Sequence, residues 1–270
     1  MTSSPPIHRL SDPADPRLVD YRNLSDIRAR RRIEGDEFFI AEGPTAIERL
    51  VASDHHLRSI LLSESRLDRF ADLIATVAAP VYVVAPDLLT EIVGFNLHRG
   101  AIAAADRQPG RSLHEIADQA QRIAILEGLN DPENLGAIAR SAHALHIDAL
   151  ILDPTCIDPY TRRTVRVSMG EILWLDWCRV DSITDALAEL HASGWETWAL
   201  TPAADADNIW TLPIPQRTAV ILGAEGPGLT TTTMMTATRR VRLPIHPDVD
   251  SLNVGHAAAV SFAVLSRPQR

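Results

Sequence analysis

Residues 122–142 read RIAILEGLNDPENLGAIARSA, an apolar segment followed by a turn and a helical pattern. The run at 122–129 has the length and composition of a buried strand, and Pro132 is suited to start a helix over 133–146. Further strand-like runs follow, with helical segments between them: DALILD, LWLDWCRV, WETWAL, TAVILGAEG and RRVRLP. Their apolar residues do not alternate with polar ones, which is typical of strands covered by helices on both faces. The second half therefore predicts a mostly parallel α/β sheet.

A smaller α/β domain is predicted ahead of this sheet. The strand-like runs FFIAEG, RSILLS, VYVVA and GAIAAADR alternate with helical segments at 44–53, at 66–79 and from Pro86. Residues 18–32 hold few apolar side chains and predict a solvated helix. We expect a flexible tail at 1–14, the small domain at 15–107, a linker rich in Pro, Gly and Ser at 108–120, and the larger domain at 121–270.

The composition is that of a soluble globular protein, with 270 residues, 46% hydrophobic and 23% charged. No apolar run approaches the roughly 18 residues of a membrane span, and the first residues lack an apolar signal core. We therefore expect a cytoplasmic protein without a membrane segment. Cys156 and Cys178 lack metal-ligand spacing, so we expect buried, inert thiols and no metal site.

The charge pattern leaves the partner open. A net charge of −9 argues against a general polyanion binder but allows a local basic patch. All 26 basic residues are arginine, which a GC-rich genome explains without selection for phosphate binding. Arg30 and Arg31, in the run IRARRR, therefore lie either on an exposed helix face or on an RNA-contacting arm. Arg162 and Arg166 either contact RNA phosphates or reflect only the general use of arginine in place of lysine.

Three segments carry the chemistry, and the first is DPENLGAIARSA at 131–142. Gly136 costs helix stability, up to about 1 kcal/mol relative to Ala, which suggests a close approach by a backbone or a ligand. Asn134 and Arg140 project from the first two turns of the predicted helix. They can border a cleft, but Asn134 can equally be a helix cap and Arg140 part of a surface ion pair.

The second segment is LGAEGPGL at 222–229, directly after an apolar strand. Its glycines allow the backbone to approach a ligand closely. It lacks the Lys and Ser or Thr of a phosphate-binding loop and the GxGxxG pattern of dinucleotide sites. Glu225 would repel a phosphate, so this loop favours a ligand that is neutral or cationic at that point.

The third segment is LPIHPDVDSLNVGHAAA at 243–259. Ser251 or Asn253 can cap the closing helix, and the other is then available to a ligand. His256, one turn further on, either packs or, if it faces the pocket, titrates near neutral pH as a second candidate base.

In this order and spacing, the three segments resemble the motifs of the SpoU family of RNA ribose 2′-O-methyltransferases, and VRVSMGEILWL at 165–175 is similar to a further family stretch. The resemblance covers about residues 120–267. It implies a sheet whose C-terminal part is threaded as a deep trefoil knot, which is rare among folds. It also implies a homodimer, with a ribosomal-protein-like N-terminal domain that binds the substrate RNA. Ala224 and Gly255-His256 depart from the usual family residues.

The same resemblance implies S-adenosyl-L-methionine as the cofactor and no metal. By position, the cofactor-binding residues are Gly223, Glu225, Gly228, Leu243, Ile245, Ser251, Leu252 and Asn253. Arg140 matches the arginine that activates the ribose hydroxyl, and Asn134 the asparagine that supports it. Because arginine has a pKa above about 12, Arg140 acts either as an unusual base or as a cation that stabilises the developing alkoxide.

The expected function is therefore RNA ribose 2′-O-methylation, with ribosomal RNA favoured over transfer RNA as a structured substrate. The alternatives are a transfer-RNA methyltransferase and a non-catalytic RNA-binding protein that retains the fold. An ordinary nucleotide-binding enzyme is disfavoured, because its glycine motif would follow the first strand and not a late one.

Overall fold

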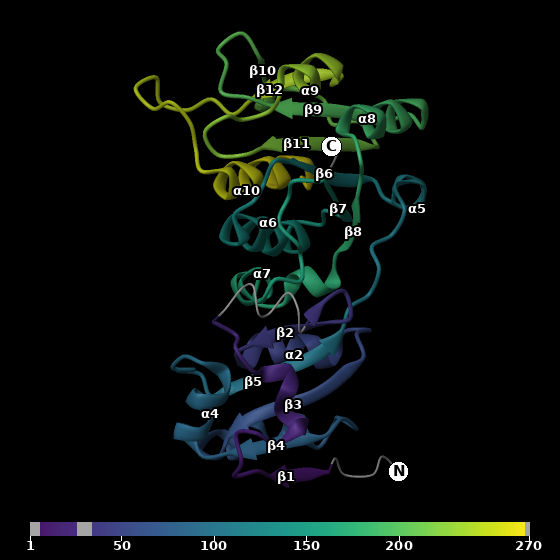
Figure 1. The fold of residues 1–270 in the computed structure, drawn as a ribbon. Coiled ribbons are helices and arrows are strands. Elements are labelled where there is room, and N and C mark those ends of the chain that lie inside the picture. The colour runs from purple at the N-terminus through teal and green to yellow at the C-terminus, as the bar shows by residue number, and fades with distance from the viewer. Residues whose placement is uncertain (1–5, 26–33, 268–270) are drawn as a thin grey trace. The chain divides into compact units, whose positions relative to one another are not determined.

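The computed structural model describes residues 6–25 and 34–267, which form two compact units (Figure 1). The first unit comprises Met1–Gln108 and Tyr160–Leu173, and the second comprises Pro109–Pro159 and Trp174–Arg270. The segment 160–173 was expected in the larger domain, but it packs with the first unit. The physical reason is local, because helix α7 (Arg162–Val167) lies against strand β2 (Phe38–Glu42) and its arginines pair with Glu42.

The first unit is built on a five-stranded sheet in the order β1-β4-β3-β5-β2. Its strands are β1 (Ile7–Arg9), β2, β3 (Leu57–Ser63), β4 (Val81–Val84) and β5 (Ala101–Asp106). β5 runs antiparallel to β2 and β3, whereas β4 is parallel to β1 and β3. Its helices are α2 (Pro44–Ala52), α3 (Ala71–Ile74), α4 (Pro86–Val93) and α7, with 3-10 turns η1 (Pro16–Tyr21), η2 (Glu64–Arg66) and η3 (Asp68–Phe70).

Three expectations for this unit are wrong. Residues 7–9 form an edge strand and not a tail, because they pair with β4 through backbone hydrogen bonds. Such pairing leaves no pattern in the side chains from which it could be predicted. The predicted helix over 66–79 is broken into η2, η3 and the short α3. Leu18 and Tyr21, assigned to a solvated helix, are fully buried, and the Tyr21 hydroxyl lies 2.7 Å from Ser59 Oγ.

The second unit contains a seven-stranded sheet in the order β10-β12-β9-β11-β6-β7-β8, with parallel pairing throughout. The strands are β6 (Arg122–Glu127), β7 (Ala149–Leu152), β8 (Asp176–Arg179), β9 (Glu196–Leu200), β10 (Asp207–Asn208), β11 (Thr218–Gly223) and β12 (Arg239–Arg242). The prediction of a mostly parallel α/β sheet is confirmed. The knot and the ribosomal-protein-like identity of the first unit stay predictions.

Helices cover this sheet on both sides. The core cluster on one face joins Ile116 of α5 (Leu113–Gln119) and Leu187 of α8 (Ile183–Ala192) to Ile125 of β6. On the other, α10 (Val254–Leu265) contacts β11 and packs along α6 (Pro132–Ala144), as Figure 1 shows. The short elements η4 (Glu171–Trp174), η5 (Ile209–Thr211) and α9 (Thr231–Thr236) complete the described chain.

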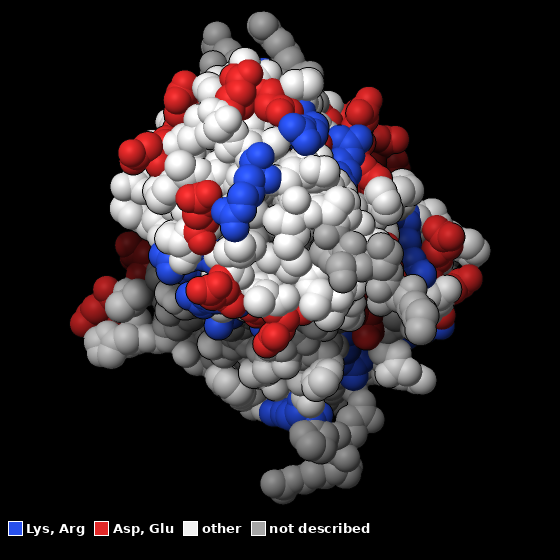
Figure 2. Space-filling view, turned by 90° about the horizontal axis from the view of Figure 1, so that it is seen from below, with Lys and Arg blue, Asp and Glu red and all other residues white. Residues whose placement is uncertain are grey.

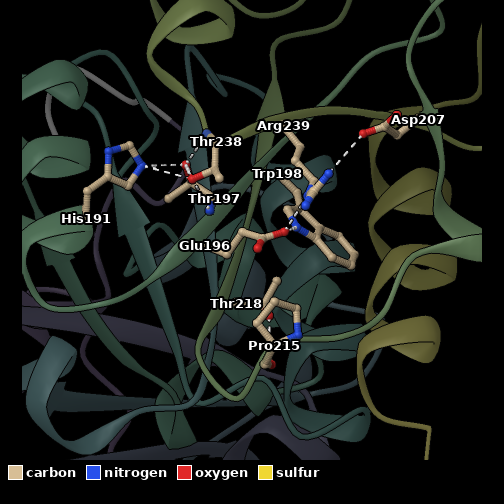
Figure 3. A network of polar contacts seen from close by, with 9 residues as sticks. All are labelled: His191, Glu196, Thr197, Trp198, Asp207, Pro215, Thr218, Thr238 and Arg239. Carbon is tan, nitrogen blue, oxygen red and sulfur yellow. Dashed lines mark hydrogen bonds and ion pairs between the residues drawn. The ribbon is translucent and has the colours of Figure 1, made fainter.

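A network of hydrogen bonds joins the amino ends of the neighbouring strands β9 and β12 (Figure 3). Thr197 at the start of β9 lies 2.8 Å from His191 Nε2 and accepts the backbone N–H of Thr238 at 3.0 Å. Beside it, Glu196 accepts hydrogen bonds from Trp198 and Arg239, both at 2.7 Å. The opposite, carboxyl ends of these strands are the place where parallel sheets bind ligands.

Within the described ranges, no helix is both long and apolar enough to cross a membrane.

Candidate functional site

A cavity of about 320 Å³ lies at the carboxyl ends of β9 and β11 and beside the chain that follows β12. The residues that line it come from the ends of these strands and from the start of α10. All residues predicted to bind the cofactor are among them, namely Gly223, Glu225, Gly228, Leu243, Ile245, Ser251, Leu252 and Asn253. The structure thus brings the second and third motifs to one cavity, while cofactor binding by these residues stays a prediction.

The glycine loop, residues 223–229, forms one closely packed wall of this cavity. Gly228 N–H donates to the carbonyl of Ala224 at 3.0 Å, which closes the turn between them. Gly226 and Gly228 have φ values of +87° and +70°, a region that strongly favours glycine. A Cβ on Gly223 would collide with the backbone of Gly228 and Leu229, so the close approach itself requires glycine there.

One side-chain amide joins the three motifs. Asn253 Nδ2 donates to Asn134 Oδ1 at 3.0 Å and to Glu225 Oε1 at 2.5 Å. Asn134 is buried at 7% exposure in the first motif, Glu225 lies in the second, and Asn253 lies in the third. Residues 119 and 28 positions apart are therefore held together at the edge of the cavity.

Two questions about helix capping are resolved by this geometry. Asn253 is the cap of α10, because its Oδ1 accepts the backbone N–H of Gly255 at 2.9 Å and of His256 at 3.3 Å. Ser251 is exposed and lines the cavity. Asp131, and not Asn134, caps α6, since its side chain accepts the N–H of Glu133 at 2.8 Å. Asn134 is therefore not a mere cap.

Arg140 is exposed in the middle of α6. In the part of the chain that the structure describes, its guanidinium makes no hydrogen bond or ion pair, so the surface ion pair considered above is absent there. It is not among the described residues that line the cavity, and neither is His256, which is exposed on the first turn of α10. The structure leaves the catalytic role of Arg140 as a prediction.

The arginines expected to contact RNA lie elsewhere. Arg162 and Arg166 both pair with Glu42, whose side chain is only 7% exposed, and the Arg162 guanidinium also sits over the Phe95 ring at 4.5 Å. Arg30 and Arg31 lie outside the described residues. On the face shown in Figure 2, basic and acidic side chains are interspersed within a broad uncharged surface.

The two thiols are buried, and burial raises the pKa of both Cys156 and Cys178 to about 12. Neither is therefore a ready nucleophile. Within residues 6–25 and 34–267, no group of three or more His, Cys, Asp or Glu side chains is arranged to hold a metal ion.

Residues 121–263 match the SpoU rRNA Methylase family. The chain belongs to this family. An uncharacterized tRNA/rRNA methyltransferase of Mycobacterium tuberculosis is 38% identical over 260 residues, which cover 95% of this chain and 90% of that protein. The 23S rRNA (guanosine-2′-O-)-methyltransferase RlmB of Vibrio cholerae is 30% identical over 171 residues, or 60% of this chain and 68% of that one.

Solved structures of SpoU-type proteins share the fold. An RNA 2′-O ribose methyltransferase superposes with a TM-score of 0.79 at 27% identity, covering 96% of this chain and 98% of that chain. The SpoU methyltransferase AviRb from Streptomyces viridochromogenes gives 0.77 at 25% identity, covering 93% and 96%. The likeness extends over both units and is not confined to the region of the family match.

The motifs did not reveal every residue that lines the cavity. Leu200, the last residue of β9, and Thr201 and Pro202, which follow it, also line the cavity. They carry no sequence signal, because a strand end becomes a pocket wall only through its neighbours in the sheet. Their place was foreseeable only from the rule that ligands bind at the carboxyl ends of parallel strands.

Proposed function

We propose that this protein is an S-adenosyl-L-methionine-dependent RNA methyltransferase that methylates a ribose 2′-hydroxyl, with ribosomal RNA as the favoured substrate. The observation that carries the proposal is the cavity at the ends of β9 and β11, whose wall contains the predicted cofactor residues of two motifs. RlmB, a relative, is named for guanosine 2′-O-methylation of 23S rRNA, which supports the ribose and the ribosomal substrate.

The residues present fit this cofactor. Leu243, Ile245 and Leu252 offer an apolar surface to an adenosine group, and the glycine loop allows close backbone contact. Glu225 is an acidic group beside the cavity, which suits a sulfonium and would repel a phosphate. When bound, S-adenosyl-L-methionine would supply an electrophilic methyl group.

The residues of the protein would align the ribose with the methyl donor and assist the loss of the 2′-hydroxyl proton. Methyl transfer to oxygen releases the hydroxyl proton, and a cation near the oxygen stabilises the alkoxide as it develops. Arg140 carries a guanidinium free of partners among the described residues, so it can serve the RNA in this way or act as the base. The hydrogen bonds of Asn253 to Asn134 and to Glu225 would fix the positions of α6, α10 and the glycine loop relative to one another.

Cofactor binding and methyl transfer test the proposal directly. We expect calorimetry to show one S-adenosyl-L-methionine site per chain, and labelled methyl groups to appear in total RNA from cells that lack the gene. Absence of cofactor binding would overturn the proposal. Binding without transfer would favour a non-catalytic RNA-binding protein, and mapping the label would decide between ribosomal and transfer RNA.

The Arg140→Ala variant tests the assigned catalytic residue. We expect methyl transfer to fall by about 100-fold or more, because general acid–base or charge-stabilising groups contribute about that much. Cofactor affinity should stay unchanged, since Arg140 lies outside the described cavity wall. Arg240→Ala, an exposed arginine of β12 that pairs with Asp205 and does not line the cavity, is the control for the loss of one arginine. Full activity of Arg140→Ala would remove Arg140 from this role.

We further propose a cytoplasmic homodimer whose first unit binds the substrate RNA. Small or apolar side chains of α10, including Ala259, Val260 and Ala263, are partly or fully exposed in the single chain. This exposure supports a dimer in which a second copy of the chain buries them. Light scattering at micromolar concentration should give twice the chain mass. A monomer at that concentration would contradict the proposed dimer, but it would not contradict the proposed cofactor site.

A further inference from the structure

Glu127 is a charged residue at the carboxyl end of β6 that none of the motifs singles out. It is only 9% exposed, and it lies opposite Gly223, the first residue of the glycine loop, in the parallel pairing of β6 with β11. A buried carboxyl group requires hydrogen-bond donors, because its desolvation is costly otherwise. The donors identify what this residue does.

Among the described residues, the donors to the Glu127 side chain are Thr230, which directly follows the glycine loop, and Thr233 on α9. The Glu127 carboxylate accepts the backbone N–H of Thr230 at 3.1 Å and the Thr230 hydroxyl at 2.8 Å. It also accepts the Thr233 hydroxyl at 2.9 Å, and Thr233 is 1% exposed. Thr230 is the N-cap residue of α9, so the carboxylate fixes the point where the loop ends and the helix begins.

One end of the loop therefore lies beside Glu127 in the sheet, and the other end is hydrogen-bonded to the Glu127 side chain. Gly223 is held through strand pairing beside Glu127, and Thr230 through the Glu127 side chain. Between these points the chain turns back on itself, and it presents Gly223, Glu225 and Gly228 to the cavity. A loop with both ends fixed has fewer conformations to lose when a ligand binds.

We propose that Glu127, with Thr233, is a positioning residue that holds the glycine loop in its ligand-binding shape and so sets the affinity for S-adenosyl-L-methionine. This inference rests on the proposed function for the identity of the ligand. Glu127 itself is not among the described residues that line the cavity, so it acts through the loop and not by contact.

Two variants and one control test the positioning role. Thr233→Val keeps the branched shape but removes one donor to Glu127, and Glu127→Gln removes the charge that all the donors share. Thr236→Val is the matched control, because Thr236 lies on the same helix and its hydroxyl donates to the carbonyl of Thr232, away from Glu127. Calorimetry with S-adenosyl-L-methionine and amide hydrogen exchange of the ligand-free protein are the two readouts.

We expect both Glu127→Gln and Thr233→Val to weaken S-adenosyl-L-methionine binding by roughly tenfold, the value of one hydrogen bond to a charged group. The KM for the cofactor should rise in parallel, kcat at saturating cofactor should change little, and exchange at 224–230 should accelerate. Thr236→Val should leave the affinity at the wild-type value. Glu127→Gln alone risks misfolding, and Thr233→Val keeps the test valid in that case.

Two results would overturn the proposal. Unchanged affinity in Thr233→Val, with a folded protein, would show that the contact serves stability only. An equal loss of affinity in Thr236→Val would show a general effect of α9. If the wild-type protein does not bind the cofactor, the proposed function fails, whereas loop exchange in the ligand-free variants still reports whether Glu127 holds the loop.

Discussion

Asn253 combines two tasks in one side chain. Its carbonyl oxygen caps α10, and its amide nitrogen reaches Asn134 and Glu225. An amide side chain carries its acceptor oxygen and its NH2 donor on separate atoms, and asparagine is the short amide that forms a good N-cap. The two tasks are therefore separable by substitution.

Asn253→Ser should separate them, because serine caps helices about as well as asparagine but has no amide to reach the other motifs. We expect the free energy of unfolding to stay within roughly 0.5 kcal/mol of wild type and methyl transfer to fall by about tenfold, through the lost hydrogen bonds. Asn253→Ala should lose about 1 kcal/mol of stability in addition. Chemical denaturation and RNA methylation are the measurements, and full activity of Asn253→Ser would contradict the linking role.

At the level of strands and helices, a buried polar network and the candidate binding cavity lie at opposite ends of the same sheet. The amino ends of β9 and β12 are tied by Thr197, Thr238 and His191, whereas the carboxyl ends form the cavity. Thr197 is fully buried, so its hydroxyl is shielded from water and its partners depend on it.

Thr197→Val should therefore destabilise the protein without touching the binding site. It leaves the Thr238 backbone N–H and the His191 ring without their shared partner, at a cost of about 1–3 kcal/mol in the free energy of unfolding. Urea denaturation measures this cost, and Thr211→Val, an exposed position, is the control. Affinity for S-adenosyl-L-methionine should not change below the unfolding transition. A large loss of affinity would show that the polar network at the amino ends of the strands also affects the cavity at their carboxyl ends.

Over the whole molecule, the chain passes between the two units more than once. The segment Tyr160–Leu173 belongs to the first unit although both of its flanks belong to the second. Its attachments to the first unit are specific. Tyr160 stacks on Phe39 with ring centroids 4.8 Å apart, Arg49 donates to the carbonyl of Met169 at 2.7 Å, and Glu42 pairs with two arginines of α7.

Glu42→Gln tests this attachment. The substitution leaves Arg162 and Arg166 without their carboxylate, which should destabilise the first unit by about 1–3 kcal/mol. The cost is below that of a fully buried pair, because the two guanidinium side chains are 29% and 33% exposed. Hydrogen exchange within 160–173 should accelerate, and exchange in β6 and β11 should not. Exchange that rises equally in both units would contradict a local attachment.

The parallel sheet, and the residues that meet at the candidate cavity, could be predicted from the sequence alone. Apolar strand runs specify burial on both faces, and glycines such as Gly223 are required wherever backbones meet closely, so their signals are local. The short helix α3 and the edge strand β1 could not be read in this way. Backbone pairing with residues 74 positions away fixes β1, and packing against the rest of the unit overrides helix propensity in 66–79.

Only the tertiary structure decided which polar residues act together. The sequence offered Ser251 or Asn253 as a cap, and Asn134 as a cap or a site residue, because one segment contains the donors and acceptors of several alternatives. The fold selected among them when it brought Asn134, Glu225 and Asn253 to one point. It also placed Glu127 behind the glycine loop, a contact between residues 103 and 106 positions apart that no local pattern encodes. A hydrogen bond needs its partners within about 3 Å, and that proximity is a property of the folded chain.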